Sequence, residues 1–363
     1  MRVAVAGAGA FGRNHLRVYR ELETGRLPVA LVAAVEPDQT RATETAARYS
    51  IPVFAGVEEL LKADLRLDAA SVAVPTVHHH SVASVLLDAG LDLLVEKPLA
   101  ATLVEADELL ALAERRNRIL QPGHLERFNP AVLAVQPKLR RPMFFEAHRL
   151  SVFTPRSLDV DVVLDLMIHD LDIVLTFANS PVREVRAVGL PILSPKVDIA
   201  NVRVEFESGC VANFTASRVS TERVRKLRFF EPRQYVSIDY ARRDLLVIRL
   251  DGSVPPEIAA ALEGGQIDSA SLAQLATGAP GGPNPGLSIA KPLVSAGEPL
   301  RLEIESFLES VRTRQSPRVT ARQGRSALAL ALEIQTSMAA HAARAGLQHF
   351  FEPSAVGPTV HES

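Results

Sequence analysis

The first third of the chain alternates short apolar runs with segments whose apolar residues recur at helical spacing. The apolar runs predict buried strands, and the segments between them predict helices. The predicted strands are 2–6, 29–35, 67–74, 91–95 and 119–121. The predicted helices are 14–22, 38–49, 77–89 and 102–116. Strand, helix and strand repeated in this way predict a parallel α/β sheet with right-handed crossovers.

After Pro122-Gly123 the pattern changes to one helix, a strand, a second helix and then a series of strands. The later strands are separated by turn signals such as Glu207-Ser208-Gly209, which predict a continuous sheet built from hairpins. These strands are 144–152, 182–190, 201–206, 211–219, 227–230, 234–239 and 245–250, and helices at 302–311 and 322–344 follow. We therefore predict two domains, 1–122 and 123–346, and a tail over 347–363.

One long stretch, residues 251–299, lacks a clear period. It contains the run Gly278-Ala279-Pro280-Gly281-Gly282-Pro283-Asn284-Pro285-Gly286, which is typical of a loop. Three interpretations stay open for this insertion: a lid over substrate, a subunit contact, or a mobile loop.

Composition narrows the class of protein. The 363 residues are 47% apolar and 23% charged, as expected of a globular protein with two cores. A net charge of −2 gives no general attraction to nucleic acid or to a membrane surface. A single cysteine, Cys210, excludes an intrachain disulfide and favours a reducing compartment. No apolar run reaches about 18 residues, and the chain begins in a strand rather than a signal peptide. We expect a cytoplasmic protein.

The first candidate for chemistry is the loop after the first strand, Gly7-Ala8-Gly9-Ala10-Phe11-Gly12. It follows a strand and precedes a helix, which is the context that a dinucleotide-binding fingerprint requires. Gly7 permits the tight turn, Gly9 lets the backbone approach a pyrophosphate, and Gly12 allows close helix–strand packing. The N–H groups at the start of the helix then hold the phosphates. The loop predicts a Rossmann domain.

Glu36 ends the second predicted strand. A carboxylate there accepts hydrogen bonds from an adenosine ribose. It also repels a 2′-phosphate, by about 4 kcal/mol for two unit charges about 4 Å apart at intermediate dielectric. We therefore predict NAD rather than NADP as the cofactor. The alternative is that Glu36 only caps the helix after Pro37.

Two further groups follow the third and fourth predicted strands: Pro75-Thr76 with His79, and Glu96-Lys97-Pro98. Ligands of parallel sheets bind beyond the carboxyl ends of the strands, so these residues are candidates for the cofactor site. A lysine near a bound nicotinamide can exchange protons with a substrate hydroxyl. The alternative is that Lys97 is a surface residue.

The segment from Asp161 to Asp172 places four polar residues on one arc of a mostly apolar helix. They are Asp161, Asp165, His169 and Asp172. Buried carboxylates and an imidazole must pair with one another or face a ligand cleft. One alternative is an N-cap at Asp161 above an internal polar network. A metal site is a weaker alternative, because three carboxylates with one histidine make a poor zinc set, and we predict no metal.

Together these motifs resemble the glucose–fructose oxidoreductase/inositol dehydrogenase/MocA (Gfo/Idh/MocA) family of NAD(P)-dependent dehydrogenases. The pattern around Glu305, Phe307 and Pro317-Arg318-Val319-Thr320 adds to the resemblance. It implies a Rossmann domain followed by an α+β domain whose open, mainly antiparallel sheet commonly makes subunit contacts. It also implies that Lys97, Asp165 and His169 form a catalytic set that oxidises a sugar or cyclitol hydroxyl. The chain departs from the family at Val160-Asp161 and Met167, where glycine is common.

The chain also resembles one subgroup, the bacterial UDP-N-acetylglucosamine 3-dehydrogenases. The resemblance lies in the sequences of Gly123 to Pro130, His148-Arg149-Leu150, Asp159 to Asp172, and Asp198 to Asp239. These enzymes make the 3-oxo sugar that an aminotransferase converts to a 3-amino sugar for lipid A. A nucleotide-sugar diphosphate needs cationic partners. The substrate candidates are Arg127, Asn129, Arg149, Arg156, Asp161, Asp165 and His169. Each arginine could instead be solvated surface, and the basic run from Arg218 to Arg228 is expected on an exposed sheet face.

We expect Lys97 and His169 to converge at the nicotinamide. His169 would take the hydroxyl proton, Asp165 would orient His169, and Lys97 would polarise the oxygen or share the proton relay. Which of Lys97 and His169 is the base stays open. Two alternatives to this function stay open. The protein could oxidise another sugar, a UDP-sugar uronate or inositol, or it could be a regulator that binds a dinucleotide without catalysis. A homo-oligomer formed through the second sheet is expected.

Overall fold

The structure is a computed structural model that describes residues 1–25, 28–154, 160–250 and 287–350. The chain divides into two units, which we describe separately. Residues 1–138 with 294–330 form the first, and residues 139–293 with 331–363 form the second. Among the described residues, no helix has both the length and the apolar character needed to cross a membrane.

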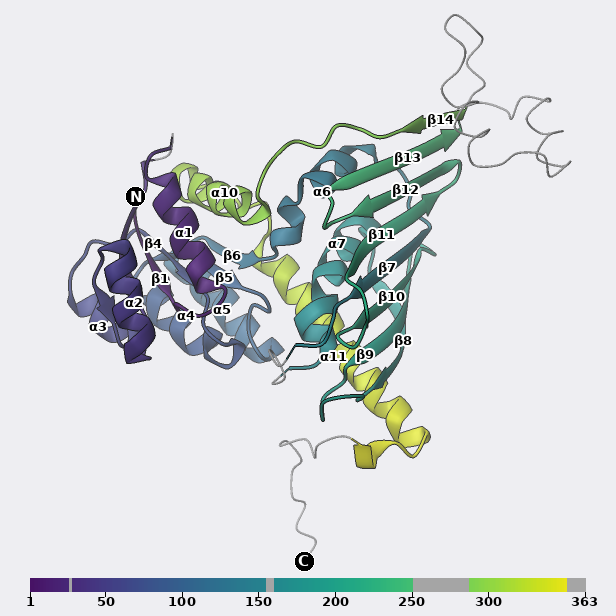
Figure 1. The fold of residues 1–363 in the computed structure, drawn as a ribbon, viewed down its shortest axis with the longest axis horizontal. Coiled ribbons are helices and arrows are strands. Elements are labelled where there is room, and N and C mark those ends of the chain that lie inside the picture. The colour runs from purple at the N-terminus through teal and green to yellow at the C-terminus, as the bar shows by residue number, and fades with distance from the viewer. Residues whose placement is uncertain (26–27, 155–159, 251–286, 351–363) are drawn as a thin grey trace, which may run out of the picture. The chain divides into compact units, whose positions relative to one another are not determined.

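The first unit is built on a six-stranded parallel sheet in the order β3-β2-β1-β4-β5-β6 (Figure 1). Its strands are β1 (Arg2–Ala6), β2 (Ala30–Val35), β3 (Val53–Phe54), β4 (Ala69–Val72), β5 (Asp92–Glu96) and β6 (Leu120–Gly123). Its helices and 3₁₀ turns are α1 (Gly12–Leu22), α2 (Gln39–Tyr49), α3 (Val57–Lys62), η1 (Thr76–His78), α4 (His79–Asp88), α5 (Leu103–Arg116), η2 (Leu125–Phe128), α6 (Pro130–Val135), η3 (Gln136–Lys138) and α10 (Pro299–Thr313). The doubly wound α/β fold predicted from the sequence is confirmed.

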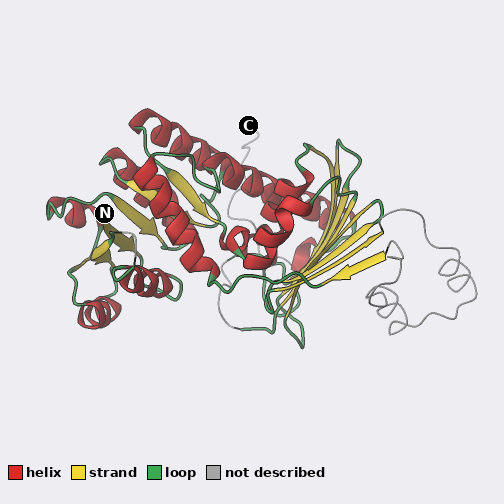
Figure 2. Cartoon of the chain, turned by 90° about the horizontal axis from the view of Figure 1, so that it is seen from above, coloured by secondary structure: helices red, strands yellow, loops and turns green. Residues whose placement is uncertain are grey.

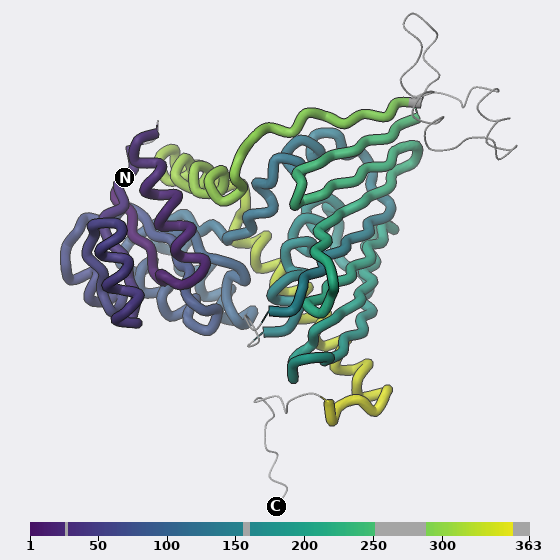
Figure 3. The backbone as a smooth tube through the Cα atoms, in the orientation of Figure 1, coloured from purple at the N-terminus to yellow at the C-terminus, as the bar shows by residue number. Residues whose placement is uncertain are grey.

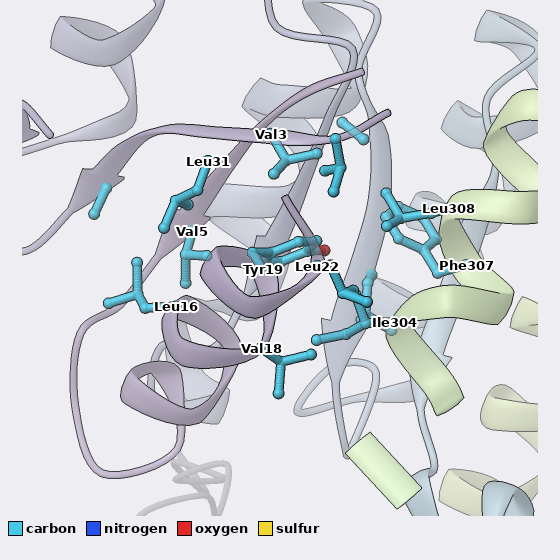
Figure 4. Packing of buried hydrophobic residues seen from close by; sticks show 14 of the residues in the cluster. Val3, Val5, Leu16, Val18, Tyr19, Leu22, Leu31, Ile304, Phe307 and Leu308 are labelled. Carbon is cyan, nitrogen blue, oxygen red and sulfur yellow. The ribbon is translucent and has the colours of Figure 1, made fainter. Parts of the chain in front are cut away.

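The core on one face of this sheet combines residues from both ends of the chain (Figure 4). Val3 and Val5 of β1 pack against Leu16 and Tyr19 of α1, and α10 contributes Phe307 to the same cluster. These side chains are removed from water, and each buried large apolar side chain stabilises the fold by about 1.5–3 kcal/mol. The core of the first unit therefore includes α10 as well as the N-terminal segment.

The second unit contains an eight-stranded sheet in the order β14-β13-β12-β11-β7-β10-β9-β8. Its strands are β7 (Phe144–Leu150), β8 (Val182–Leu190), β9 (Ile199–Phe206), β10 (Val211–Ser217), β11 (Val224–Glu231), β12 (Gln234–Asp239), β13 (Asp244–Leu250) and β14 (Leu287–Ala290). Strands β7 and β10 are parallel, and the other paired strands of this sheet are antiparallel. The chain can be followed through the successive hairpins in Figure 3. The predicted α+β domain with a mainly antiparallel sheet is confirmed.

Helices cover one face of this sheet (Figure 2). They are η4 (Val163–Met167), α7 (Ile168–Ala178) and the C-terminal part of α11 (Ala321–Arg344), and η5 (Gln348–Phe350) follows. Along β9, buried and more exposed residues alternate, as expected when one face of a strand packs on a core. Phe177 of α7 lies edge-on to Phe229 of β11, with ring centroids 6.1 Å apart. The α7 side of the sheet is therefore the core side.

The units differ from the predicted domains at their boundaries. Residues 123–138 belong to the first unit, which also takes residues 294–330, and the division within the C-terminal region falls inside α11. The reason is packing, because η2 and α10 are close neighbours in the first unit. A boundary placed where the sequence pattern changes cannot show that a later segment, residues 294–330, packs with the first unit again.

The sequence pattern did not predict several short elements, among them β3, α3 and β14. Strand β14 lies inside the stretch that we expected to be a loop, and it pairs with β13 at the sheet edge. Residues 251–286 of that stretch lie outside the described residues, as do residues 351–363 of the predicted tail. The three interpretations of the insertion therefore stay predictions.

Candidate functional site

The loop between β1 and α1 requires two of its three glycines for steric reasons. Gly7 has a φ of +94°, and a Cβ atom there would lie 2.6 Å from the carbonyl oxygen of Ala73. A Cβ atom on Gly12 would lie 1.8 Å from the carbonyl oxygen of Gly7. Any larger residue at either position forces the backbone apart. Gly7 and Gly12 thus fix the tight turn and the close approach of α1.

The third glycine has no such explanation within the protein. A Cβ atom on Gly9 would meet no atom within 4 Å, and Gly9 is not in the left-handed region. Phe11 precedes the first turn of α1 and makes no side-chain cap hydrogen bond, and Ala10 and Phe11 are exposed. Open space over backbone N–H groups at the positive end of a helix suits a pyrophosphate. The loop therefore fits a dinucleotide.

Glu36 follows β2 and binds the same loop. Its Oε2 accepts a hydrogen bond from the N–H of Ala8 at 3.0 Å, and its Oε1 accepts one from the N–H of Asp38 at 3.0 Å and one from Arg41 at 2.9 Å. Burial works to raise the pKa of Glu36, but these three donors outweigh it and hold the pKa below its ordinary value. Asp38, rather than Glu36, caps α2 by accepting from the N–H of Arg41. The carboxylate is therefore charged, buried and beside the glycine loop.

His79 lies behind the end of β4 as a structural bridge. Its side chain is buried, with Nδ1 2.7 Å from the carbonyl oxygen of Pro98 and Nε2 2.9 Å from that of Val74. The ring thus joins the end of β4 to the turn after β5, where the Lys97-Pro98 peptide is cis. Pro75 and Thr76 lie between these anchors and are more exposed. The predicted contact of His79 with the cofactor stays a prediction, because both of its ring nitrogens already face carbonyl groups.

Glu96 connects the strand that ends at Lys97 with the glycine-loop helix. Its Oε1 lies 2.9 Å from Nε2 of His15, and both side chains are buried. Nδ1 of His15 is buried and has no hydrogen-bond partner in the described structure. Lys97 itself is half-buried. The position of Lys97 after β5 is therefore tied to the first turns of α1.

In the second unit, the Asp165–His169 segment begins with a capped end. Oδ1 of Asp161 accepts from the N–H groups of Val163 and Leu164 at 2.9 and 3.1 Å, and Oδ2 accepts from Gln335. Asp161 is thus the N-cap of the alternative interpretation. Its carboxylate oxygens are engaged within the protein.

The segment is not a regular α-helix, because Val163–Met167 forms a π-helical turn before α7 begins. A π turn holds more residues than an α turn, so the single arc drawn from α-helical spacing does not apply here. Asp165 and His169 are half-buried, whereas Asp172 is buried. The structure therefore separates the half-buried Asp165 and His169 from the buried Asp172.

Two of the predicted substrate residues, Arg149 and Asn129, are buried and form hydrogen bonds within the protein. Arg149 forms a two-pronged ion pair with Asp170, with Nε–Oδ2 at 2.6 Å and Nη2–Oδ1 at 3.0 Å, and it lies over the ring of Tyr240. Asn129 accepts from the N–H of Ala131 and caps α6. Charge neutralisation and burial give Arg149 a structural role that the sequence pattern did not indicate. Arg127 is also buried, in η2, and Arg156 lies outside the described residues.

Arg218 corrects another expectation, because it is buried rather than exposed on the sheet. It donates to the carbonyl oxygens of Val160 at 2.6 Å and Val197 at 3.2 Å, and its Nε lies 3.4 Å from Oδ1 of Asp198. Asp198 in turn accepts from the N–H groups of residues 192–194. The other basic residues of the run, at 223, 225, 226 and 228, are exposed or half-buried as expected. The pair fixes the chain just before Asp161.

The sequence also matches models of known protein families. A family model described as an oxidoreductase family with an NAD-binding Rossmann fold matches residues 1–124, and a model of the GFO/IDH/MocA C-terminal domain matches residues 132–233. The chain belongs to the Gfo/Idh/MocA oxidoreductase family. It is therefore an NAD-dependent dehydrogenase, and the cofactor predicted from the glycine loop and Glu36 is confirmed.

Similarity to individual family members extends over nearly the whole chain. UDP-N-acetylglucosamine 3-dehydrogenase of Acidithiobacillus ferrooxidans is 34% identical over 342 residues, which cover 94% of this chain and 98% of the relative. A solved structure of that enzyme aligns with a TM-score of 0.79 at 32% identity, covering 94% of this chain and 98% of the other. Inositol 2-dehydrogenase of Leifsonia xyli subsp. xyli is 31% identical over 51% of this chain and 56% of its own length.

Several residues that shape this dehydrogenase carry no motif. His15 and Tyr19 lie one turn apart on the buried face of α1; His15 meets Glu96, and the Tyr19 hydroxyl lies 2.8 Å from the hydroxyl of Ser71. The only signal in the sequence is a polar side chain at helical spacing with apolar residues, which is also typical of ordinary core positions. Asp170 gave the same ambiguous signal beside His169.

The Asp198–Arg218 pair predicts a pH-dependent loss of stability in one variant. Burial works to raise the pKa of Asp198, but the Ser194 hydroxyl and three N–H groups hold it below its ordinary value. A lowered folded pKa stabilises the protein above the unfolded value of about 3.9 and loses that contribution as pH falls through the folded value. Asp198→Asn removes the carboxylate charge beside the buried Arg218 guanidinium, so we expect about 3 kcal/mol lower unfolding free energy at neutral pH.

Urea unfolding of Asp198→Asn and wild type from pH 7 to pH 3 measures this difference, which should shrink towards the acid end. Asp244→Asn, at an exposed site in β13, is the matched control and should stay close to wild type. An equal difference at every pH would show that the lost charge is not the cause.

Proposed function

We propose that the protein oxidises the C3 hydroxyl of UDP-N-acetylglucosamine to the 3-oxo sugar. The observation that carries this proposal is the full-length similarity to a UDP-N-acetylglucosamine 3-dehydrogenase, at 34% identity over 94% of this chain. The retention of Lys97, Asp165 and His169 supports a dehydrogenase rather than a dinucleotide-binding regulator, since a regulator has no need of a proton relay.

The first unit would hold the cofactor. The loop from Gly7 to Gly12, with Ala10 and Phe11 at its tip, would bind the pyrophosphate, and Glu36 would accept from the adenosine ribose. Pro75, Thr76, Glu96 and Lys97 would frame the nicotinamide end, with His79 bracing the turn behind them. NAD supplies the hydride acceptor when bound.

The protein's own part of the reaction is the movement of one proton. We assign His169 to accept it from the C3 hydroxyl, because a half-buried imidazole is the side chain best suited to proton transfer near neutral pH. Asp165 would orient the imidazole, and Lys97 would polarise the same oxygen or pass the proton onward. The hydroxyl carbon loses a hydride and its oxygen loses a proton, which leaves the ketone.

The substrate's diphosphate needs cationic partners. Arg149 is neutralised by Asp170, so we assign it to the fold rather than to the diphosphate. Arg127 and Arg156 remain proposed substrate contacts. Asp161 and Asn129 would act through the segments that they cap.

A panel of substrates tests the proposal. Enzyme and NAD are mixed with UDP-N-acetylglucosamine, the corresponding uronate, free N-acetylglucosamine and myo-inositol, and NADH formation is followed by absorbance. We expect UDP-N-acetylglucosamine to give the highest kcat/KM. A preference for myo-inositol, supported by the partial similarity to an inositol 2-dehydrogenase, would replace the substrate assignment. NADH binding without turnover of any sugar would favour a regulator.

We further propose a place for this reaction in the cytoplasm, ahead of an aminotransferase that converts the 3-oxo sugar to a 3-amino sugar for lipid A precursors. A 3-oxo sugar is a ketone, which a transaminase can convert to an amine. The single cysteine of the chain suits a reducing compartment.

A homo-oligomer formed through the second sheet is also proposed. An apolar row crosses six strands on the face opposite α7: Val211, Phe144, Phe230, Tyr235, Ile248 and Ile289 are aligned by strand register. All six are half-buried, and the rings of Phe144 and Phe230 stack 5.4 Å apart. A continuous apolar row on a monomer's surface is unusual and is typical of a contact between proteins.

Phe230→Asp places a charge at the centre of this row, and we expect the variant to sediment with a smaller mass than wild type. Ser237→Asp, on the same face but outside the row, is the matched control and should keep the wild-type mass. Equal masses for wild type and Phe230→Asp would remove the row from the interface.

A further inference from the structure

His15 is a buried ionisable residue that the proposed reaction does not use. It lies in the first turn of α1, is fully buried, and has Nε2 2.9 Å from Oε1 of Glu96 at the end of β5. The side chain of Glu96 is only 9% exposed. Removing two such groups from water is costly, and apolar residues of similar volume often stabilise a core equally well or better. Stability alone therefore does not explain why this pair occurs here.

The carboxylate of Glu96 is confined on two sides. His15 holds it from α1, and the neighbouring strand β6 places Gly123 beside it in register. A Cβ atom on Gly123 would lie 2.8 Å from Oε1 and 2.9 Å from Cδ of Glu96. The ring of His15 in turn meets the ring of Phe11 in the glycine loop edge-on, with centroids 5.5 Å apart. The carboxylate therefore has little freedom to move while His15 is present.

Lys97 is the residue that a released carboxylate would affect. It follows Glu96 directly, and both charges act on the same buried imidazole. Burial lowers the pKa of His79, two carbonyl groups raise it, and the charge of Glu96 raises it while that of Lys97 lowers it. A buried charge is costly unless it is paired, so without His15 the Glu96 carboxylate is expected to pair with the Lys97 amine. Such a pair would hold the amine away from a substrate hydroxyl.

We propose that His15 is a positioning residue for Lys97, which holds the Glu96 carboxylate against α1 and so leaves the lysine amine available to the substrate. The proposal rests on the assignment of Lys97 to the reaction. It gives the first turn of α1 a second task, because the turn that follows the glycine loop also fixes the residue before Lys97.

A double-mutant cycle tests whether His15 acts through Lys97. Reduction of NAD in a single turnover is measured with the sugar of the panel above that gives the highest kcat/KM, for wild type, His15→Leu, Lys97→Ala and His15→Leu/Lys97→Ala. NADH fluorescence gives the dissociation constant of the cofactor, and thermal unfolding gives the stability of each variant.

Two further variants separate positioning from a loss of stability. Tyr19→Phe is the matched control, because it removes another buried hydrogen bond between α1 and the sheet, the one that joins the hydroxyls of Tyr19 and Ser71. His15→Gln is the conservative variant, because its amide retains an N–H donor for the Glu96 carboxylate.

We expect His15→Leu to lower the single-turnover rate by about 10- to 100-fold when Lys97 is present, the size of loss when a reacting group is misplaced by about 1 Å. In the Lys97→Ala background the same change should have almost no effect. His15→Gln should recover most of the rate. Tyr19→Phe should keep the wild-type rate, even where it lowers the unfolding temperature as much as His15→Leu does.

The contrary outcomes are distinct from one another. If His15→Leu lowers the rate by the same factor with and without Lys97, the positioning role is overturned while the role of Lys97 stands. A weaker cofactor complex with an unchanged rate would assign His15 to the glycine loop instead. If Lys97→Ala itself reacts at the wild-type rate, both assignments fail.

Discussion

Lys97→Ala is expected to lower kcat by about 10²- to 10⁴-fold, the range of one general acid–base group, while NAD still binds. The half-buried lysine follows β5 directly, and its backbone is held by Glu96, which bonds to His15. The alanine variant keeps that anchor, since the buried His15–Glu96 pair does not involve the Lys97 side chain. Stopped-flow NADH formation gives kcat, and NADH fluorescence gives the binding constant.

Lys62→Ala, at the exposed end of α3, is the control for loss of one lysine. Lys97→Cys followed by S-aminoethylation offers a second check, because it restores an amine at the same place. Cys210 does not interfere, since burial leaves it 1% exposed and raises the pKa of its thiol to about 11. Activity that returns on alkylation supports the role of the amine, whereas a Lys97→Ala variant with wild-type kcat removes Lys97 from the chemistry.

His169→Asn is expected to slow reduction of NAD in a single turnover by about 10²- to 10⁴-fold at neutral pH. Asparagine keeps hydrogen-bonding capacity but cannot accept a proton in this pH range. Because α7 is held by the Asp161 cap and by the Arg149–Asp170 pair, the variant should unfold at the wild-type temperature. Rapid mixing of the enzyme–NAD complex with excess sugar measures the step, and thermal unfolding measures stability.

His349→Asn, at an exposed position in η5, is the matched control. Asp165→Asn should give a smaller loss than His169→Asn, as a group that acts through the imidazole. A His169→Asn variant that reduces NAD at the wild-type rate would assign the proton transfer elsewhere, and Lys97 would be the remaining candidate base.

Much of the first unit could be predicted because its determinants are local. A buried parallel strand is an apolar run, and the sequence around Thr102 forms the capping box that begins α5, with both reciprocal hydrogen bonds present. The need for Gly7 and Gly12 follows from backbone geometry and was also readable from the motif. The motif also indicated the charged residue Glu36 after β2. Its hydrogen-bond donors, however, could be identified only from the structure.

The missed features depend on partners that are distant in sequence. The sequence makes Arg149 a candidate for binding the diphosphate, but in the structure it pairs with Asp170 on another element. Arg218 belongs to a basic run in the sequence and was therefore expected on an exposed sheet face. In the structure it is buried and contacts Val160 and Asp198. The π turn over Val163–Met167 is a small change of helical pitch among apolar residues, and helical periodicity cannot resolve it.

The proposed reaction removes a hydride from C3 of a nucleotide sugar. UDP-N-acetylglucosamine carrying deuterium at C3 tests it directly when mixed with enzyme and NAD, followed by mass analysis of the reduced cofactor. We predict NADH that contains one deuterium, formed more slowly than from the unlabelled sugar. Reduced cofactor without deuterium would place the oxidation at another carbon, and no reduced cofactor at all would contradict the proposed substrate.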